Sequence, residues 1–276
     1  MIEFWNGDGG RKWVNYKDRM DITLSPFGQK AIESARILDG ERVLDLGCGC
    51  GNTTFEIANR VGADGYVQGM DVSRPILAEA KARILTGKER NISFEFSDAQ
   101  KHVFNSDEFD VIYSRFGVMF FDDPISAFNN IRQSLVAGGR LAFVCWQPIK
   151  MNQWVSLPFD VVSKHIPLPP DDDPEQPGAF SLGNKDRLMR VLSEAGYSDI
   201  SIEPFHSSFN LGADLYQAIE FITDMGPASY VINEEEHSRE LIASIVNDLN
   251  KELIPYINGN GVSLDAATWI VTARNN

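Results

Sequence analysis

Residues 43–54 read VLDLGCGCGNTT, and this stretch decides the fold of the chain. A hydrophobic run ends in Asp45, three glycines alternate with cysteines, and a helix-like segment follows. Glycine leaves the backbone bare, so a ligand can approach main-chain atoms closely. The next strand-like run, Tyr66–Asp71, also ends in an acid, 20 residues after Gly51. An acid at this distance can accept hydrogen bonds from both hydroxyls of a ribose, so the pattern predicts a site for a nucleoside-containing ligand.

The kind of nucleoside is indicated by the details of the loop, because dehydrogenases share a glycine-rich turn. Asp45 lies where a dinucleotide fold usually has an apolar residue. The spacing of Gly47, Gly49 and Gly51 is followed by Asn52, so the third glycine of G-x-G-x-x-G is missing. A negative Asp45 would repel a pyrophosphate and suit a cationic ligand. These features argue against a nicotinamide dehydrogenase, which is the third hypothesis for this chain.

The segment from Asp45 to Gly51 closely resembles motif I of class I methyltransferases that depend on S-adenosylmethionine. The resemblance continues in the family's order and spacing. It includes an acid after the third strand-like run, at Ser97-Asp98-Ala99, and the segments 109–117 and 135–143. Similar segments cover roughly residues 40–147. The remainder resembles methyltransferases of the ubiquinone/menaquinone-biosynthesis type and related small-molecule methyltransferases more loosely.

The resemblance implies S-adenosylmethionine as the cofactor and a set of cofactor-binding residues. Asp71, with Val72 beside it, would bind the ribose, and Asp98 and the main-chain amide of Ala99 would hold the adenine. The amino-acid portion would lie between the loop and the end of the fourth strand. The complete predicted set is Asp45, Gly47, Gly49, Asn52, Asp71, Val72, Asp98, Ala99, Ser114 and Arg115.

Five of these residues have structural alternatives that the sequence leaves open. Asp71 could cap the following helix, and Asp98 could be a solvated loop acid. Asp45 could organise hydrogen bonds in the loop or face the ammonium of the ligand. Arg115 could pair with a nearby acid, and Ser114 could be a small residue where the backbone passes close.

No catalytic residue is identified by the sequence. Histidine suits the role of a base, and His165 is the best candidate of the four histidines, but none lies in a motif that marks a base. Cys48 and Cys50 have no matching Cys/His pair, so no metal site is predicted. Several aromatic residues could close over the donor, line an apolar acceptor pocket or belong to the core: Trp5, Trp13, Tyr16, Phe116, Phe120 and Phe121.

Composition restricts the partners. The net charge of −14 argues against broad electrostatic binding of nucleic acid, and the Asn/Asp-Pro-Pro-aromatic motif of base-methylating enzymes is missing from residues 114–117. Three cysteines indicate a reducing compartment, and no signal peptide or apolar run of ~18 residues is evident, so we expect a cytoplasmic protein without an integral membrane segment. The expected partner is a small-molecule substrate, and a homodimer is left open.

The alternation of strand-like and helix-like segments predicts an α/β fold: a Rossmann-like, seven-stranded, mostly parallel sheet with an antiparallel last strand and helices on both faces. Strands are expected at 42–46, 66–70, 92–96, 109–113, 141–146, 198–205 and 267–273. Helices are expected near 10–20, 26–38, 52–61, 73–84, 124–136 and 185–195.

Four regions are predicted. They are an N-terminal helical arm at 1–40, a cofactor-binding core at 41–147, a proline-rich lid insertion at 148–183, and the rest of the core at 184–276 with a helical insertion at about 213–255. The leading functional hypothesis is methyl transfer to a small, partly apolar molecule. The alternative is a regulatory or scaffold protein that binds S-adenosylmethionine without turnover.

Overall fold

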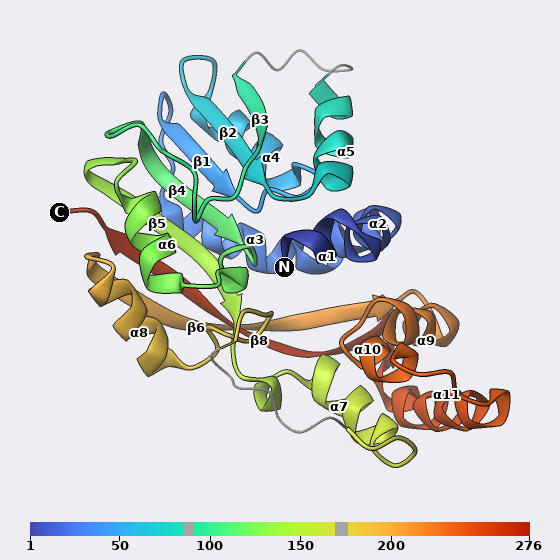
Figure 1. The fold of residues 1–276 in the computed structure, drawn as a ribbon. Helices are drawn as coiled ribbons and strands as arrows, with labels where there is room; N and C mark the ends of the chain where they lie inside the picture. The colour runs from blue at the N-terminus through green and yellow to red at the C-terminus, as the bar shows by residue number, and fades with distance from the viewer. Residues whose placement is uncertain (85–90, 169–175) are drawn as a thin grey trace. The chain divides into compact units, whose positions relative to one another are not determined.

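The computed structural model describes residues 1–84, 91–168 and 176–276 (Figure 1). The part of the predicted lid at 169–175, with its acidic run, lies outside the described residues. The chain divides into two compact units. The first comprises Met1–Trp146, Glu175–Phe205 and Thr268–Asn276, and the second comprises Gln147–Pro174 and His206–Ala267.

The sheet confirms the predicted Rossmann-like fold class. Its strands follow the order β3-β2-β1-β4-β5-β8-β6, and a short β7 pairs with β8. The pairs β2–β3, β1–β2, β1–β4 and β4–β5 are parallel, whereas β5–β8 is antiparallel. The strands are β1 (Arg42–Leu46), β2 (Tyr66–Asp71), β3 (Ile92–Phe96), β4 (Phe109–Arg115), β5 (Leu135–Trp146), β6 (Ser198–Gly212), β7 (Ile257–Asn258) and β8 (Gly261–Arg274).

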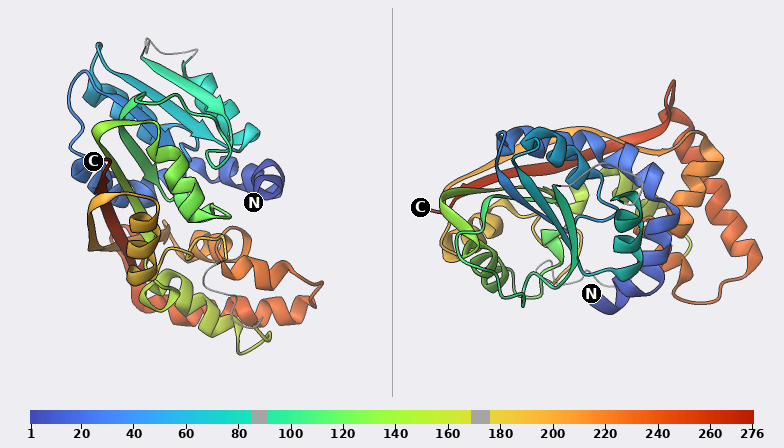
Figure 2. Two further views of the ribbon diagram at one scale, coloured as in Figure 1. Left: turned by 60° about the vertical axis from the view of Figure 1, so that its left-hand side comes forward. Right: turned by 90° about the horizontal axis from the view of Figure 1, so that it is seen from above.

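Helices cover both faces of the sheet within the first unit. α3 and α4 contact each other and lie against one face, whereas α6 and α8 contact each other on the opposite face (Figures 1 and 2). The N-terminal α1 and α2 precede them, and α2 contacts α5. The bounds are α1 (Ile2–Asn6), α2 (Asp8–Asn15), α3 (Lys17–Ala35), α4 (Asn52–Val61), α5 (Arg74–Ile84), η1 (Val118–Phe120), α6 (Pro124–Arg132) and α8 (Lys185–Glu194).

The second unit contains the remaining helices and parts of β6 and β8. Trp154 in α7 stacks on Phe209 in β6 with ring centroids 4.2 Å apart, which joins two segments distant in sequence. The predicted helical insertion is confirmed as α9, α10 and α11. The bounds are η2 (Ile149–Met151), α7 (Gln153–Val162), α9 (Leu215–Asp224), α10 (Ala228–Asn233), α11 (Arg239–Leu253) and η3 (Ile254–Tyr256).

The prediction of two separate helices near 10–20 and 26–38 is wrong. α3 runs without interruption from Lys17 to Ala35, with Pro26 in its interior. A proline there removes one helical hydrogen bond and costs about 3 kcal/mol. The helix buries one apolar face that includes Leu24, Phe27 and Ile32, and this packing outweighs the local penalty.

The predicted boundary between the helix at 124–136 and the strand at 141–146 is also wrong. α6 ends at Arg132, and β5 begins at Leu135, which pairs with Phe109. The register of β4 and β5 shifts after this pair, so Gly138 and its neighbour lie in an irregular part of a strand and do not end a helix. The last two long strands are longer than predicted, since β6 and β8 both continue into the second unit.

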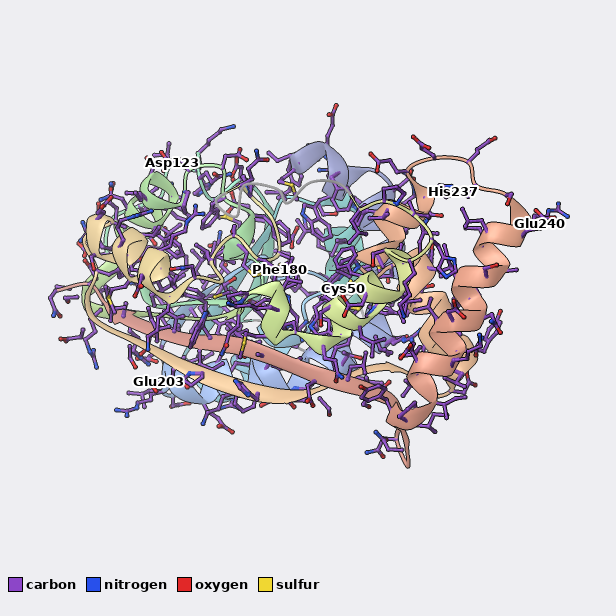
Figure 3. All side chains as sticks on the ribbon, turned by 90° about the horizontal axis from the view of Figure 1, so that it is seen from below. Cys50, Asp123, Phe180, Glu203, His237 and Glu240 are labelled. Carbon is purple, nitrogen blue, oxygen red and sulfur yellow. The ribbon has the colours of Figure 1, made fainter. Side chains whose placement is uncertain are left out.

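The surface charge agrees with the acidic composition. Asp123, Glu203 and Glu240 are three of the exposed carboxylates, and each lies at the surface of its own unit (Figure 3). Within the described part of the chain, no helix combines the length and the apolar character needed to span a bilayer.

Candidate functional site

The glycine loop joins β1 to α4. Gly47, Gly49 and Gly51 all have positive φ angles, of 66°, 58° and 86°, which side chains rarely tolerate. The amides of Gly47 and Cys48 both donate to the carbonyl of Met70 in β2, at 2.8 and 3.2 Å. These bonds attach the loop to the end of the neighbouring strand, where a nucleoside ligand binds in this topology.

The loop packs directly on the segment that follows β4. A Cβ on Gly47 would lie 2.8 Å from the Cα of Gly117, and one on Gly117 would lie 2.8 Å from the carbonyl oxygen of Leu46. The residue between β4 and Gly117 is Phe116, whose φ of 59° is unusual for a bulky side chain. Its ring stacks on Trp146 with centroids 4.2 Å apart. The strained turn therefore brings backbone against backbone below the glycine loop.

Asp71 ends β2 and is half-buried. Its Oδ2 accepts the amide of Gly49 at 2.9 Å, and its Oδ1 accepts the amide of Ser73 at 2.9 Å. Burial raises the pKa of this carboxyl group, and the backbone hydrogen bonds oppose that shift. The bond to Gly49 joins the predicted ribose acid to the glycine loop across the site.

Asp45 ends the buried part of β1 and is fully buried. Its Oδ2 accepts hydrogen bonds from the hydroxyls of Thr53 and Thr54, at 2.8 and 2.6 Å. Its Oδ1 has no hydrogen-bond partner among the described residues. Burial raises the pKa of Asp45 to about 6, although the two threonine hydroxyls stabilise the charged form. The hydrogen-bonding role foreseen for Asp45 is therefore present at one oxygen, and the other is left for a ligand.

Ser114 and Arg115 make the structural contacts that the sequence left open. The Ser114 hydroxyl donates to the carbonyl of Leu46 at 2.8 Å and accepts the amide of Gly117 at 3.2 Å. The Arg115 guanidinium pairs with Asp21 of α3 at 2.8 Å. Ser114 thus links the two backbone segments below the loop, and a role of either residue toward a donor stays a prediction.

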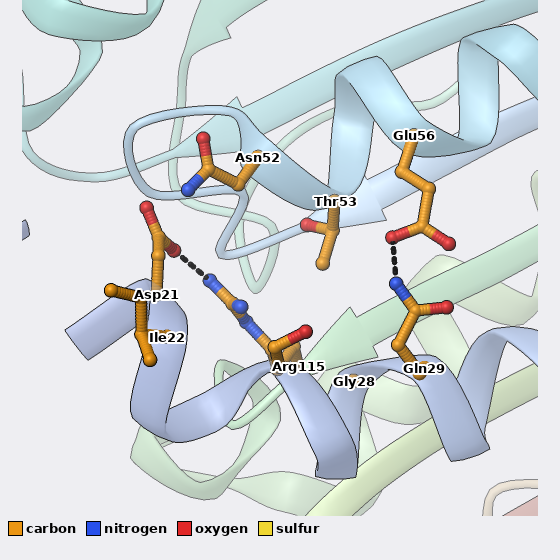
Figure 4. A pocket seen from close by; sticks show the side chains of 9 residues that line it. Asp21, Ile22, Gly28, Gln29, Asn52, Thr53, Glu56 and Arg115 are labelled. Atoms are coloured by element: carbon orange, nitrogen blue, oxygen red, sulfur yellow. Dashed lines mark hydrogen bonds and ion pairs between the residues drawn. The ribbon is translucent and has the colours of Figure 1, made fainter. Parts of the chain in front are cut away.

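A pocket of about 270 Å³ lies beside the start of α4. Asp21 is bonded to Arg115 in this pocket, and Gln29 is bonded to Glu56 (Figure 4). Asn52, the first residue of α4, also lines it, and its side-chain oxygen accepts a hydrogen bond from Arg83. The pocket thus offers charges of both signs next to the glycine loop.

The third strand leads to Asp98 and Ala99. Oδ1 of Asp98 accepts the amide of Gln100 at 3.0 Å, whereas Oδ2 is buried and accepts no hydrogen bond from the described residues. Lys101 Nζ lies 3.7 Å from that oxygen. The carbonyl of Ala99 accepts the side-chain amide of Asn130 at 2.8 Å, which holds the loop in place. This region lies directly after β3, and the amide of Ser97 donates to the carbonyl of Asp71 at 3.1 Å.

The predicted residues therefore gather along the ends of β1, β2, β3 and β4, but the sequence reasoning missed several neighbours. Val72 contacts Asn6 of the N-terminal arm, whose side-chain amide donates to the Val72 carbonyl at 2.7 Å. Trp13 of α2 lies beside the loop, with its Nε1 3.8 Å from the position of a Cβ on Gly49. No local sequence signal marks Asn6 or Asp21, because their partners are far away in the chain.

The best histidine candidate for a base is engaged elsewhere. His165 Nε2 lies 3.0 Å from Oδ2 of Asp248 within the second unit. His102 Nδ1 lies 2.9 Å from the hydroxyl of Ser97, behind the adenine loop. Among the described residues, no group of three or more His, Cys, Asp or Glu side chains is placed to hold a metal ion.

A glycine loop after β1, acids at the ends of β1 and β2, and an antiparallel strand beyond β5 define the class I methyltransferase fold. The family model described as the ubiE/COQ5 methyltransferase family matches residues 25–170, and the chain belongs to this family. It is a methyltransferase that uses S-adenosylmethionine as the methyl donor and acts on small molecules.

Two relatives and one solved structure illustrate the similarity. The ubiquinone/menaquinone biosynthesis C-methyltransferase UbiE of Methylococcus capsulatus is 31% identical over 67% of this chain and 79% of its own length. The aklanonic acid methyltransferase DauC of Streptomyces sp. strain C5 is 29% identical over 74% of this chain and 84% of its own. The YcgJ protein of Bacillus subtilis shares the fold, with a TM-score of 0.58, 16% identity, and coverage of 91% and 97%.

Proposed function

We propose that the protein transfers the methyl group of S-adenosylmethionine to a small, partly apolar molecule, with the donor bound along the ends of β1, β2, β3 and β4. The observation that carries the donor site is the buried Oδ1 of Asp45, which has no hydrogen-bond partner among the described residues and lies beside a glycine loop. An unpaired buried carboxylate oxygen is costly, and a cationic ligand group would relieve that cost.

The amino-acid end of the donor fits the charges beside α4. Its ammonium group would face Asp45, and its carboxylate would face the Arg115 guanidinium and the pocket lined by Asn52. Arg115 has five N–H donors, so it can keep its contact with Asp21 and still bind a second carboxylate. Gly47 and Gly49 would let the chain of the ligand pass close to the backbone.

The nucleoside end of the donor fits Asp71 and Asp98. Each Asp71 oxygen accepts one amide and retains a second lone pair, so the carboxylate can also accept a ribose hydroxyl at each oxygen. Val72 follows directly in the chain and would flank the ribose. Oδ2 of Asp98 is available for the adenine amino group, and the amide of Ala99 would meet the ring. The buried position of Ala99 keeps this part of the site away from water.

The donor supplies an already activated methyl group, so the protein mainly aligns the acceptor and excludes water. Trp5, Trp13 and Phe120 form an edge-to-face cluster on the first unit, with Trp5 at the centre, 5.8 and 5.5 Å from the other rings. These half-buried rings lie next to Gly49 and favour an acceptor with an apolar face. Phe116 and Phe121 instead pack on Trp146 and Phe128.

The names of the relatives agree with an acceptor of this class, since one acts on aklanonic acid and another in ubiquinone and menaquinone biosynthesis. The net charge of −14 makes a nucleic acid a poor acceptor. We assign no catalytic base. A regulatory protein without turnover is the alternative, and membership of a methyltransferase family favours turnover over it.

Two measurements test the proposal. Titration calorimetry with S-adenosylmethionine and S-adenosylhomocysteine should give saturable binding of both. A screen of quinols, phenols, amines and carboxylates should then identify an acceptor that forms a methylated product, with the aromatic compounds preferred. Tight donor binding without product from any acceptor would support the regulatory alternative. Failure of both ligands to bind would contradict the donor site itself.

A further inference from the structure

We infer that Asn6 is a positioning residue of the donor site, and that the N-terminal arm, residues 1–16, orders the ribose loop through it. This inference rests on the proposed function, because the ribose loop is defined here as Val72–Arg74, the segment that directly follows Asp71. Asn6 acts through the backbone of this loop and does not touch the reacting atoms.

The Asn6 side chain binds the ribose loop with both of its polar atoms. Its Nδ2 donates to the carbonyl of Val72 at 2.7 Å, and its Oδ1 accepts the amide of Arg74 at 3.0 Å. One amide group therefore satisfies a carbonyl and an N–H that lie two residues apart, as an adjacent strand would. Because β2 ends at Asp71, the loop beyond it lacks the ladder bonds that hold the strand itself. Asn6 supplies the replacement.

Ser73 makes a second connection between the arm and the site. Its hydroxyl donates to the carbonyl of Trp5 at 2.6 Å, and its amide donates to Oδ1 of Asp71 at 2.9 Å. The Ser73 side chain is fully buried, so these bonds are shielded from water. The arm, the ribose loop and the carboxylate are consequently joined within three consecutive hydrogen-bonded groups.

The arm is shaped for this close approach. A Cβ on Gly10 of α2 would lie 2.0 Å from the carbonyl oxygen of Trp5 and 3.0 Å from the Ser73 hydroxyl oxygen. The first of these atoms belongs to the backbone, so a side chain at this position would force α1 and α2 apart. Lys17, at the start of α3, also forms an ion pair with Glu79 of α5. Docking of the arm on the loop is thus built into several positions, and Asn6 is the one that reaches the loop backbone.

Docking and donor binding must then be coupled in both directions. If the docked arm favours the loop geometry that binds the ribose, bound donor favours the docked arm by the same factor. Removing the amide of Asn6 should therefore weaken donor affinity, and bound donor should protect the arm from solvent exchange. A residue with a purely structural role would lower the unfolding midpoint without this reciprocal effect.

The test compares four proteins by titration calorimetry with S-adenosylmethionine and S-adenosylhomocysteine: wild type, Asn6→Ala, Asn6→Asp and Asn15→Ala. Asn6→Ala should weaken both ligands by about 5- to 20-fold, as expected for an ordinary coupling between two sites. Asn6→Asp keeps an acceptor for the Arg74 amide but cannot donate to the Val72 carbonyl, so it should weaken them as well. Asn15 is exposed at the end of α2, and its variant should bind like wild type.

The second readout is hydrogen exchange of residues 1–16 with and without S-adenosylhomocysteine. The ligand should slow exchange of the arm in wild type and in Asn15→Ala, and this protection should be reduced in both Asn6 variants. Wild-type affinity in a folded Asn6→Ala protein would overturn this inference alone. If wild type binds neither ligand, the donor site is wrong and the inference is overturned with it.

Discussion

The ends of β1 and β2 carry carboxylates in opposite states. Asp45 at the first is fully buried, and one of its oxygens accepts no hydrogen bond from the described residues. Asp71 at the second is half-buried, and both of its oxygens accept backbone amides. The difference indicates two jobs: Asp71 suits neutral hydroxyl groups that share its lone pairs, whereas Asp45 suits a cationic group that compensates a buried charge.

The largest expected effect comes from the half-buried acid. Asp71→Ala should weaken S-adenosylmethionine binding by about 1.5–3 kcal/mol, since hydrogen bonds to a charged group are lost. It also removes the acceptor of the Gly49 amide, which loosens the glycine loop. Calorimetric dissociation constants provide the measurement, with the exposed Asp64→Ala as the matched control. An unchanged dissociation constant would count against the ribose assignment.

The buried acid should respond with the opposite sign in stability. Burial raises the pKa of Asp45 to about 6, so the native state holds a proton more tightly than the unfolded chain between about pH 4 and pH 6. The contribution of Asp45 to the unfolding free energy therefore increases as the pH falls through 6. Each pH unit of displacement is worth about 1.4 kcal/mol, and we expect Asp45→Asn to stabilise the free protein by about 1–2 kcal/mol at pH 7.

Urea unfolding of wild type and Asp45→Asn at pH 5 and pH 7.5 measures this difference directly. The stability advantage of the variant should shrink at the lower pH, while its donor affinity at pH 7.5 should fall, because the charge that faces the ammonium is gone. A variant that is less stable than wild type at pH 7.5 would show that the Asp45 charge is already compensated in the free protein.

A third change tests the backbone contact that supports both acids. Gly117→Ala places a methyl group 2.8 Å from the carbonyl oxygen of Leu46 and 3.0 Å from the Cα of Gly47, so the glycine loop must move. Overpacking of this kind costs about 1–2 kcal/mol, and we expect a comparable loss of donor affinity. The matched control is Gly178→Ala, where the nearest atom to a Cβ is 3.9 Å away. Equal behaviour of the two variants would contradict the close packing of the loops.

The smallest effect is expected at Ser114. Ser114→Ala removes a hydroxyl that donates to Leu46 and accepts from Gly117, which should cost about 1 kcal/mol in unfolding free energy. Donor affinity should change by less than threefold, because both partners of the hydroxyl are protein backbone. A large loss of affinity in a stable variant would instead show that the hydroxyl contacts the donor.

Local sequence patterns predicted the first five strands and the glycine loop because alternation, turn residues and spacing are local properties. They failed where tertiary packing decides. α3 continues through Pro26 because its apolar face is buried, and the turn before β5 is irregular because Leu135 pairs with Phe109. Both outcomes depend on partners that a local window does not contain.

The candidate site follows the same division. The acids at the strand ends were identifiable from their position after hydrophobic runs. The contacts of Asn6 with Val72 and of Arg115 with Asp21 were not, since the partners are separated by 66 and 94 residues. Only the folded chain shows that the N-terminal arm contributes to the ribose loop.

The most direct test of the central claim is a crystal structure of the protein soaked with S-adenosylmethionine. The ribose hydroxyls should lie within hydrogen-bonding distance of the Asp71 carboxylate, and the ammonium should face Oδ1 of Asp45 across the glycine loop. Donor density elsewhere on the protein, or a ribose that contacts neither oxygen of Asp71, would contradict the account.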